Sequence, residues 1–262
     1  MLLVRIIVLL TILAPLTLVN AQIQQCQKII VAGNIQWPPY TILASRETDD
    51  IQDSSVNLQG IGMDIAKQIF AELDVPVEEA LYSDPSQMAA GLRDGTIDLI
   101  VNTYNDSSLL AYATIVQPSY INDPITIAMP ISASKNITDW DSLVGLSGVK
   151  EISLTPDDQV NDFFISYLQI TNKANLLANL EAVKNSEYQY IVGSDLQLTY
   201  AINNNNLNSD LIVMKNLNKP AQVHMAFASD SPCKLYAVYL QKRLQDYKNN
   251  GTVEKIMKKY RY

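Results

Sequence analysis

The chain has 262 residues, and its 27 acidic and 19 basic side chains give a formal net charge of −8 at neutral pH. Nucleic acid binding needs clustered Lys and Arg, and the only basic cluster, KIMKKYRY, is the extreme C-terminus, so the composition argues against a nucleic acid partner. Hydrophobic residues make up 48% of the chain, which is typical of a globular protein rather than a disordered one.

The N-terminus has the features of a secretory leader. Arg5 precedes the apolar run IIVLLTILA, which is broken at Pro15, and Val19 and Ala21 stand at the spacing that a signal peptidase reads. The run is short for a membrane span. We therefore predict a cleavable signal peptide over residues 1–21 and a periplasmic location.

The chain contains two cysteines, Cys26 and Cys233. In an oxidising compartment a disulfide between them is the default interpretation, with two buried free thiols as the alternative. Lipidation of Cys26 is disfavoured, because Gln24 and Gln25 occupy positions where a lipoprotein leader has small residues.

Strands and helices alternate along the first part of the chain. GIGMDIAKQIFAEL places its apolar residues on one helical face, and TIDLIVNTY is a continuous apolar run typical of a buried strand. Strands are predicted over residues 28–33, 75–81 and 96–104, and helices over residues 60–73 and 85–95.

A second α/β pattern follows. Strands are predicted over residues 125–131, 149–155 and 221–229, and helices over residues 137–146, 156–169, 233–251 and 252–260, with a helix, a strand and a helix within residues 180–202. This alternation predicts an α/β fold with largely parallel sheets that helices cover on both faces.

Several motifs occur in a familiar order: IIVAGNIQWPPYTI, LQGIGMDIAKQIFAEL, MAAGLRDGTIDLIVN, QPSYINDPITIAM and LQDYKNNGTVEKIMKKY. In this order the chain resembles the family 3 extracellular solute-binding proteins, the periplasmic receptors of polar amino-acid ABC transporters. The resemblance covers nearly the whole chain after the leader.

The resemblance implies a type 2 periplasmic binding fold, in which two lobes joined by two crossing segments hold a ligand in the cleft between them. It assigns residues 22–122 and 221–262 to lobe 1 and residues 123–220 to lobe 2, with the crossings near PSYINDPIT and LNKPAQV. Cys26 and Cys233 then belong to the same lobe, so a disulfide would leave the hinge free.

The segment IQWPPYTI fixes two aromatic rings at the end of a strand. Trp37 precedes a proline and is driven to an extended backbone, while Pro38 and Pro39 fix φ. A rigid ring at the carboxyl end of a strand can stack on a ligand. We expect Tyr40 to be the packed ring; whether Trp37 faces the cleft or fills the core stays open.

The resemblance places further lobe 1 ligand contacts at Asn34, Ile61, Thr103, Asn105 and Ser107. All but Ile61 can donate or accept hydrogen bonds, as a polar cleft requires. The family usually has an aromatic residue at the place of Ile61. The alternative for each is an ordinary strand-end or loop residue.

One residue departs from the family pattern. Amino-acid receptors have an arginine that binds the ligand carboxylate, and Leu110 takes its place here. Loss of one member of such a pair costs roughly 2 to 5 kcal/mol. Binding of a free α-amino acid in the usual way is therefore doubtful.

In lobe 2 the resemblance places the ammonium-binding carboxylate at Asp195. The helix start that normally receives anionic ligand groups contains Thr155, Asp157 and Asp158, although acids there also serve as simple caps. Our hypothesis is a cationic or neutral ligand whose amine pairs with Asp195 while Trp37 contacts its body.

Two other functions were weighed. A dehydratase on this fold could use Asp195 and Asp157, but the single histidine, His224, is predicted to be structural, and nucleophile turns, metal spacings and phosphate loops are lacking. We therefore predict no enzyme activity and no cofactor. An orphan receptor or sensor with a degenerate cleft is the other alternative. Expected partners are a small-molecule ligand and an ABC permease, and the expected state is a monomer.

Overall fold

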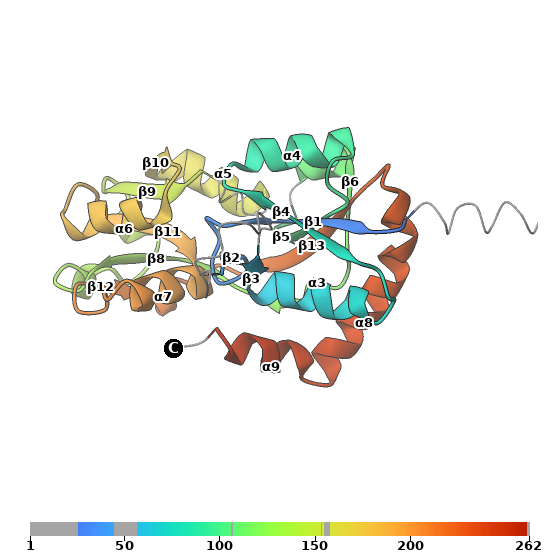
Figure 1. The fold of residues 1–262 in the computed structure, drawn as a ribbon. Helices are drawn as coiled ribbons and strands as arrows, with labels where there is room; N and C mark the ends of the chain where they lie inside the picture. The colour runs from blue at the N-terminus through green and yellow to red at the C-terminus, as the bar shows by residue number, and fades with distance from the viewer. Residues whose placement is uncertain (1–25, 45–56, 106, 153, 155–157, 261–262) are drawn as a thin grey trace, which may run out of the picture.

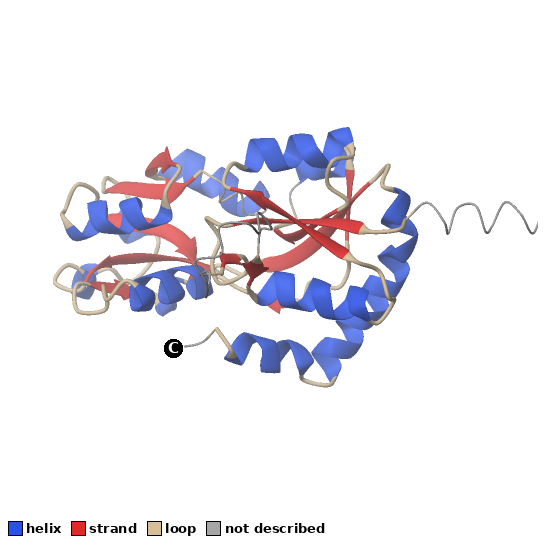
Figure 2. Ribbon diagram, in the orientation of Figure 1, coloured by secondary structure: helices blue, strands red, loops and turns tan. Residues whose placement is uncertain are grey.

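The computed structural model describes residues 26–44, 57–105, 107–152, 154 and 158–260. The predicted signal peptide, residues 1–21, lies outside the described residues. Two lobes lie side by side, each with its own β-sheet and covering helices (Figures 1 and 2). Within the described part of the chain, no helix is both long and apolar enough to span a membrane.

Lobe 1 is built on a six-stranded sheet with the strand order β4-β1-β5-β13-β6, and β7 pairs with β13. The strands are β1 (Ile29–Asn34), β4 (Val77–Tyr82), β5 (Leu99–Thr103), β6 (Ala113–Ile115), β7 (Ile121–Asn122) and β13 (Gln222–Ala228). β2 (Ile42–Leu43) and β3 (Leu58–Gln59) form a separate antiparallel pair. The helices are α3 (Ile61–Ala71), α4 (Pro85–Asp94), α8 (Ala237–Asn249) and α9 (Thr252–Lys258).

Strand alternation explains why both faces of this sheet are covered. Val31 packs into the same hydrophobic cluster as residues of α3, α8 and α9, whereas its neighbour Ala32 packs with Met88 and Leu92 of α4. Successive side chains of a strand point to opposite faces, so continuous apolar strands require helices on both sides. Figure 1 shows α4 on one side of the sheet and α3 on the other.

Lobe 2 is built on a five-stranded sheet with the strand order β10-β9-β11-β8-β12. The strands are β8 (Ile125–Pro130), β9 (Ser147–Glu151), β10 (Gln169–Lys173), β11 (Tyr190–Ser194) and β12 (Leu211–Val213). The helices are α5 (Asp158–Tyr167), α6 (Leu176–Lys184) and α7 (Asp195–Asn204).

Short 3-10 turns occur in both lobes. They are η1 (Ser107–Ala111), η2 (Ser134–Asn136), η3 (Asp141–Leu143), η4 (Lys215–Leu217) and η5 (Pro232–Tyr236).

Two expectations differ from the structure. Both sheets are mixed: β13 runs antiparallel to β5 and β6, and β8 runs antiparallel to β11 and β12. These two strands follow the crossings, so each enters its sheet from the other lobe. The predicted helix over residues 137–146 is also wrong, because the segment forms only the turn η3. The Trp140 indole N–H there donates to the carbonyl of Leu217.

The two crossings between the lobes are bonded to each other. Ile125 and Lys219 exchange backbone hydrogen bonds, with N to O distances of 2.9 and 2.8 Å. One crossing leads from β7 into β8, and the other leads from η4 into β13. The lobes are therefore joined by a short antiparallel pair of segments.

The predicted disulfide is confirmed. Cys26 and Cys233 are bonded, with their Cα atoms 5.0 Å apart, and lie 207 positions apart in the sequence. Cys26 precedes β1 and Cys233 lies in η5, so both belong to lobe 1. The bond links the segment just before β1 to the C-terminal segment that returns to lobe 1, and it does not connect the two lobes.

Candidate functional site

The turn after β1 fixes the position of Trp37. The Asn34 carboxamide oxygen accepts the Gln36 N–H at 2.9 Å, and the Asn34 carbonyl accepts the Trp37 N–H at 3.0 Å. The Trp37 ring is only 5% exposed and lies with its centre 4.7 Å from that of Tyr104 and 5.6 Å from that of Tyr40. The two prolines thus hold a buried ring at the strand end.

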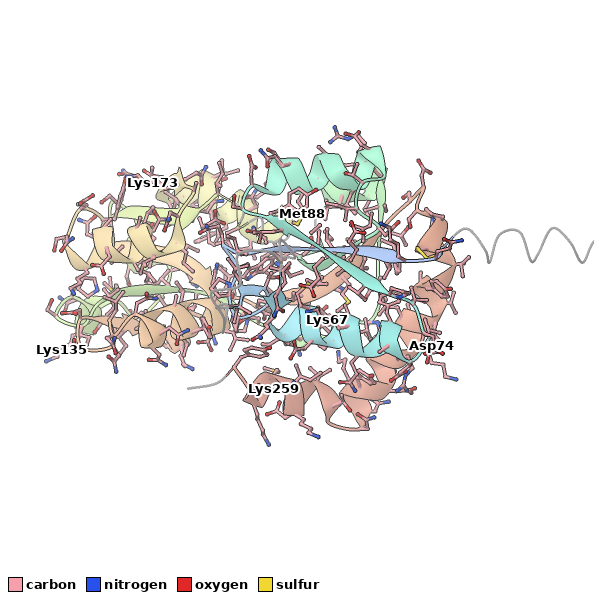
Figure 3. All side chains as sticks on the ribbon, in the orientation of Figure 1. Lys67, Asp74, Met88, Lys135, Lys173 and Lys259 are labelled. Atoms are coloured by element: carbon pink, nitrogen blue, oxygen red, sulfur yellow. A yellow bond between two sulfur atoms is a disulfide. The ribbon has the colours of Figure 1, made fainter. Side chains whose placement is uncertain are left out.

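A cavity of about 220 Å³ lies beside this ring, and we call it the lobe 1 cavity. Its walls come from the ends of β1 and β5, from α4 and from η1. Three predicted site residues line it together: Asn34, Trp37 and Thr103. Met88 of α4, labelled in Figure 3, also lines it. Sequence reasoning missed the other lining residues, among them Asn102 and Tyr104.

Three buried polar atoms of residues that line this cavity have no protein hydrogen-bond partner: the indole Nε1 of Trp37, the amide Nδ2 of Asn102 and the hydroxyl of Tyr104. The first two atoms can only donate, whereas a hydroxyl can donate or accept. The other end of the Asn102 amide is satisfied, because its Oδ1 accepts from the Thr41 hydroxyl at 3.2 Å. An unpaired buried donor costs about 1 to 3 kcal/mol.

The other predicted lobe 1 residues lie elsewhere. Ile61 is fully buried in the core at the start of α3. Asn105 lines a neighbouring cavity with His224, and Ser107 is an exposed residue of η1. Leu110, at the place of the family arginine, is 59% exposed. The structure therefore gathers only part of the predicted set around Trp37.

Asp195 faces a different cavity, which we call the hinge cavity and which measures about 320 Å³. Its carboxylate lies 3.4 Å from the Lys215 ammonium and accepts from the Thr199 hydroxyl at 3.2 Å. Ser194 caps α7, so Asp195 is the first helical residue. Asp195 and Trp37 thus line separate cavities in this structure, and the hypothesis that one ligand contacts both stays a prediction.

Three predicted residues of lobe 2 contribute no described side chain. Thr155 and Asp157 lie outside the described residues, and Asp158 begins α5. Their assignment as ligand contacts stays a prediction.

A buried carboxylate that sequence reasoning missed lies on the first crossing. Asp123 accepts the Tyr40 hydroxyl at 2.8 Å and the Leu196 N–H, at the start of α7, at 2.9 Å. Burial raises the pKa of this carboxyl to about 6, while hydrogen bonds from Ser194, Leu196 and Tyr40 oppose the shift. Asp123 is the acidic residue of PSYINDPIT, a segment that the resemblance assigns only to a crossing.

The lobes also meet through Gln36. The Gln197 side chain of α7 donates from Nε2 to the Gln36 carbonyl at 2.9 Å, and the Leu176 N–H donates to the Gln36 carboxamide at 3.4 Å. Gln36 belongs to the Trp37 turn, so the wall of the lobe 1 cavity is tied directly to lobe 2. Tyr40 is fully buried, as predicted.

His224 has a structural environment, as predicted. It is 2% exposed, and its Nδ1 lies 3.1 Å from the Val116 carbonyl. Burial lowers the pKa of its imidazole. Among the described side chains, no cluster of three or more His, Cys, Asp or Glu could hold a metal ion.

A family model described as "Bacterial extracellular solute-binding proteins, family 3" matches residues 29–261. A search of curated proteins gave no match. Three solved structures are similar in fold. The first is AbpA from Streptococcus pneumoniae, an amino acid ABC transporter substrate-binding protein bound to L-arginine, with 15% identity, coverage of 89% of this chain and 94% of that one, and a TM-score of 0.72.

One of the other two is a sensor domain. A histidine kinase sensor domain with similarity to periplasmic binding proteins has 15% identity, coverage of 90% and 97%, and a TM-score of 0.71. The periplasmic VFT2 domain of BvgS from Bordetella pertussis has 14% identity, coverage of 92% and 97%, and a TM-score of 0.73. At this level of identity the likeness shows the fold alone.

Proposed function

The chain belongs to family 3 of the bacterial extracellular solute-binding proteins, and on this premise we propose that it captures a small solute between its lobes and delivers it to an ABC permease. The solute would bind in the lobe 1 cavity, and hinge closure would bring lobe 2 over it. The protein would act as a monomer in the periplasm after removal of residues 1–21.

The observation that supports this proposal is the position of the lobe 1 cavity beside a contact between the lobes. Trp37 lines the cavity, and the adjacent Gln36 receives hydrogen bonds from Gln197 and Leu176 of lobe 2. Binding of a solute against Trp37 would thus be coupled to the angle between the lobes. The Asp195 carboxylate pairs with Lys215 in this structure, and an amine contact with Asp195 stays a prediction.

A sensor module is the second candidate function. Leu110 occupies the place of the family arginine, and one of the similar structures is a histidine kinase sensor domain. A receptor that reports to a membrane protein needs the same cavity and hinge but no permease. Fold alone does not separate the two functions.

The test begins with a thermal-shift screen of amino acids, amines, small peptides and sugars. A ligand at a hundred times its Kd should stabilise the protein by about 2.7 kcal/mol. Small-angle X-ray scattering with the hit should show compaction, and Trp37→Ala should abolish the thermal shift. Leu110→Ala, at an exposed residue outside the cavity, serves as the matched control.

Uptake measurements then separate transport from sensing. Deletion of the gene should abolish cellular uptake of the labelled hit if the chain feeds a permease. Uptake that persists while gene expression changes would instead favour the sensor. A screen in which no molecule changes the scattering profile would contradict solute capture altogether.

A further inference from the structure

The lobe 1 cavity contains two buried groups that can only donate hydrogen bonds and that have no acceptor. Trp37 is 5% exposed and Asn102 is 1% exposed, and the Nε1 and Nδ2 atoms of these two residues lack an acceptor. The two amide oxygens nearby are already used: the Asn34 Oδ1 accepts from Gln36, and the Asn102 Oδ1 accepts from Thr41. The Tyr104 hydroxyl, which also lines the cavity without a partner, can donate to a ligand oxygen as well. A ligand oxygen that accepts from both donors would remove a cost that the empty site bears.

The same cavity has no formal charge among its described lining residues. Arg93 stacks on Tyr112, with its guanidinium carbon 5.1 Å from the ring centre, but it does not line the cavity. Against the described walls, an ionised carboxylate would therefore lose its hydration without gaining a cationic partner.

Much of the remaining wall is apolar and the space is small. The side chains of Met88, Leu92, Ile100 and Leu109 line the cavity. Its volume of about 220 Å³ lies below the range of about 300 to 1,000 Å³ that is typical of sites for drug-sized ligands. These walls fit a compact apolar body better than an extended polar chain.

We propose that the lobe 1 cavity takes a small neutral molecule with an apolar body and an oxygen acceptor directed at Trp37 Nε1 and Asn102 Nδ2. A free zwitterionic amino acid is disfavoured. This inference rests on the proposed function, because it assumes that the lobe 1 cavity is the solute site. The ligand class follows from the two donors and from the lack of charge on the described walls.

The test compares probes of similar carbon skeleton and different charge by isothermal titration calorimetry. ε-Caprolactam is neutral with a carbonyl acceptor, ε-aminocaproate is its zwitterionic open form, cyclohexylammonium is a cation and cyclohexanecarboxylate is an anion. The lactam should bind about tenfold or more tightly than each ionised probe, because only the ionised groups must be desolvated without a partner.

Two variants test the donors themselves. Trp37→Phe keeps a ring but removes the N–H, and it should weaken lactam binding about tenfold. Trp140→Phe is the matched control, because that indole already donates to Leu217 and lies in lobe 2. Asn102→Asp exchanges the donor for a carboxylate, so it should weaken the lactam and strengthen cyclohexylammonium.

The inference is overturned if an ionised probe binds as tightly as the lactam, if Trp37→Phe leaves lactam affinity unchanged, or if no probe binds up to about 1 mM. Its failure can be told from that of the proposed function by scattering. An ionised solute that closes the lobes would contradict the ligand class and leave solute capture standing. The absence of closure with every screened molecule would contradict solute capture.

Discussion

Tyr40 and Asp123, 83 positions apart in the sequence, are joined by a hydrogen bond in which the tyrosine hydroxyl donates to the carboxylate over 2.8 Å. The same carboxylate accepts the Leu196 N–H of α7. The buried side chain of Asp123, on the first crossing, thus connects the Tyr40 ring of lobe 1 to the first turn of α7 in lobe 2.

Asp123 should make stability depend on pH in the direction opposite to most carboxylates. Its pKa is raised to about 6 by burial, so between about pH 4 and pH 6 the folded state binds more protons than the unfolded state. The free energy of unfolding should therefore fall as pH rises across this window. A shift of this size corresponds to on the order of 2 to 3 kcal/mol.

Asp123→Asn isolates this contribution. The amide can still accept from Leu196 and can hydrogen-bond to Tyr40, but it does not titrate. In urea unfolding at a series of pH values, the variant should gain stability relative to the parent chain between about pH 4 and pH 6. If the difference in free energy of unfolding between the variant and the parent chain stays constant from about pH 4 to pH 6, the raised pKa of Asp123 is contradicted.

The contact between Gln197 and Gln36 should favour the closed arrangement of the lobes. Gln197→Met keeps the volume and removes the donor to the Gln36 carbonyl. The loss of about 1 kcal/mol should shift the lobes toward an open form, measured as a larger radius of gyration by X-ray scattering. Gln245→Met, which removes an exposed bond to Asn249 within α8, is the control and should leave the radius unchanged.

Glu72, at the end of α3, should stabilise lobe 1 at neutral pH but not in acid. It accepts hydrogen bonds from Arg243 at 2.6 and 2.8 Å and from the hydroxyls of Tyr239 and Tyr247 at 2.9 and 2.6 Å. The Arg243 bonds are the main reason that its pKa is lowered to about 2. This stability is present above the unfolded pKa and is lost as pH falls from about 4.5 toward 2.

Glu72→Gln should cost about 1 kcal/mol at neutral pH, since the group is partly exposed, and should cost little near pH 2. Urea unfolding at both pH values measures this. Glu78→Gln offers a matched comparison, because Glu78 and its partner Lys28 are 53% and 57% exposed. That substitution should change stability by less than about 0.5 kcal/mol. An equal effect of the two substitutions would contradict the assigned role of the α3–α8 contact.

The disulfide should govern the stability of lobe 1 and not its ligand binding. Its two half-cystines are 207 positions apart, so it closes a long loop in the unfolded chain, and its removal should cost about 2 to 5 kcal/mol. The Cys26→Ser/Cys233→Ser double variant measures this by urea unfolding. Reduction with dithiothreitol should have the same effect, because the chain has no other cysteine.

Solute affinity should stay unchanged in the folded double variant, because neither cysteine lines the lobe 1 cavity. Calorimetry at a temperature where both chains are folded checks this. A large loss of affinity would mean that the bond shapes the cavity from a distance.

The fold was predictable where periodicity is strong. The pattern of GIGMDIAKQIFAEL gave α3 to within a few residues, and α4 ends at Gly95, as predicted, with this glycine in a left-handed conformation. The segment around Trp140 was not predictable, because contacts of its ring with Phe163 and Phe164 decide its path and the sequence does not reveal them. Short strands such as β6 and β12 depend on their partners in the same way.

The site was predictable only at strand ends. Trp37 was argued from its position after a predicted strand, whereas Asn34 and Thr103 were placed by the resemblance, and the three residues line one cavity at the ends of β1 and β5. Asn102 was missed because it lies within an apolar strand. Asp195 was placed by the resemblance alone, and in the structure it is the first residue of α7 and lines the hinge cavity.

The distribution of indole rings has a practical consequence. The chain has two tryptophans: Trp37 beside the lobe 1 cavity and Trp140 packed on Phe163 and Phe164 in lobe 2. Each lobe therefore contains its own intrinsic fluorophore. Single-tryptophan versions of the protein would report on the two halves separately, so that solute entry and the melting of either half could be followed by emission without any attached dye.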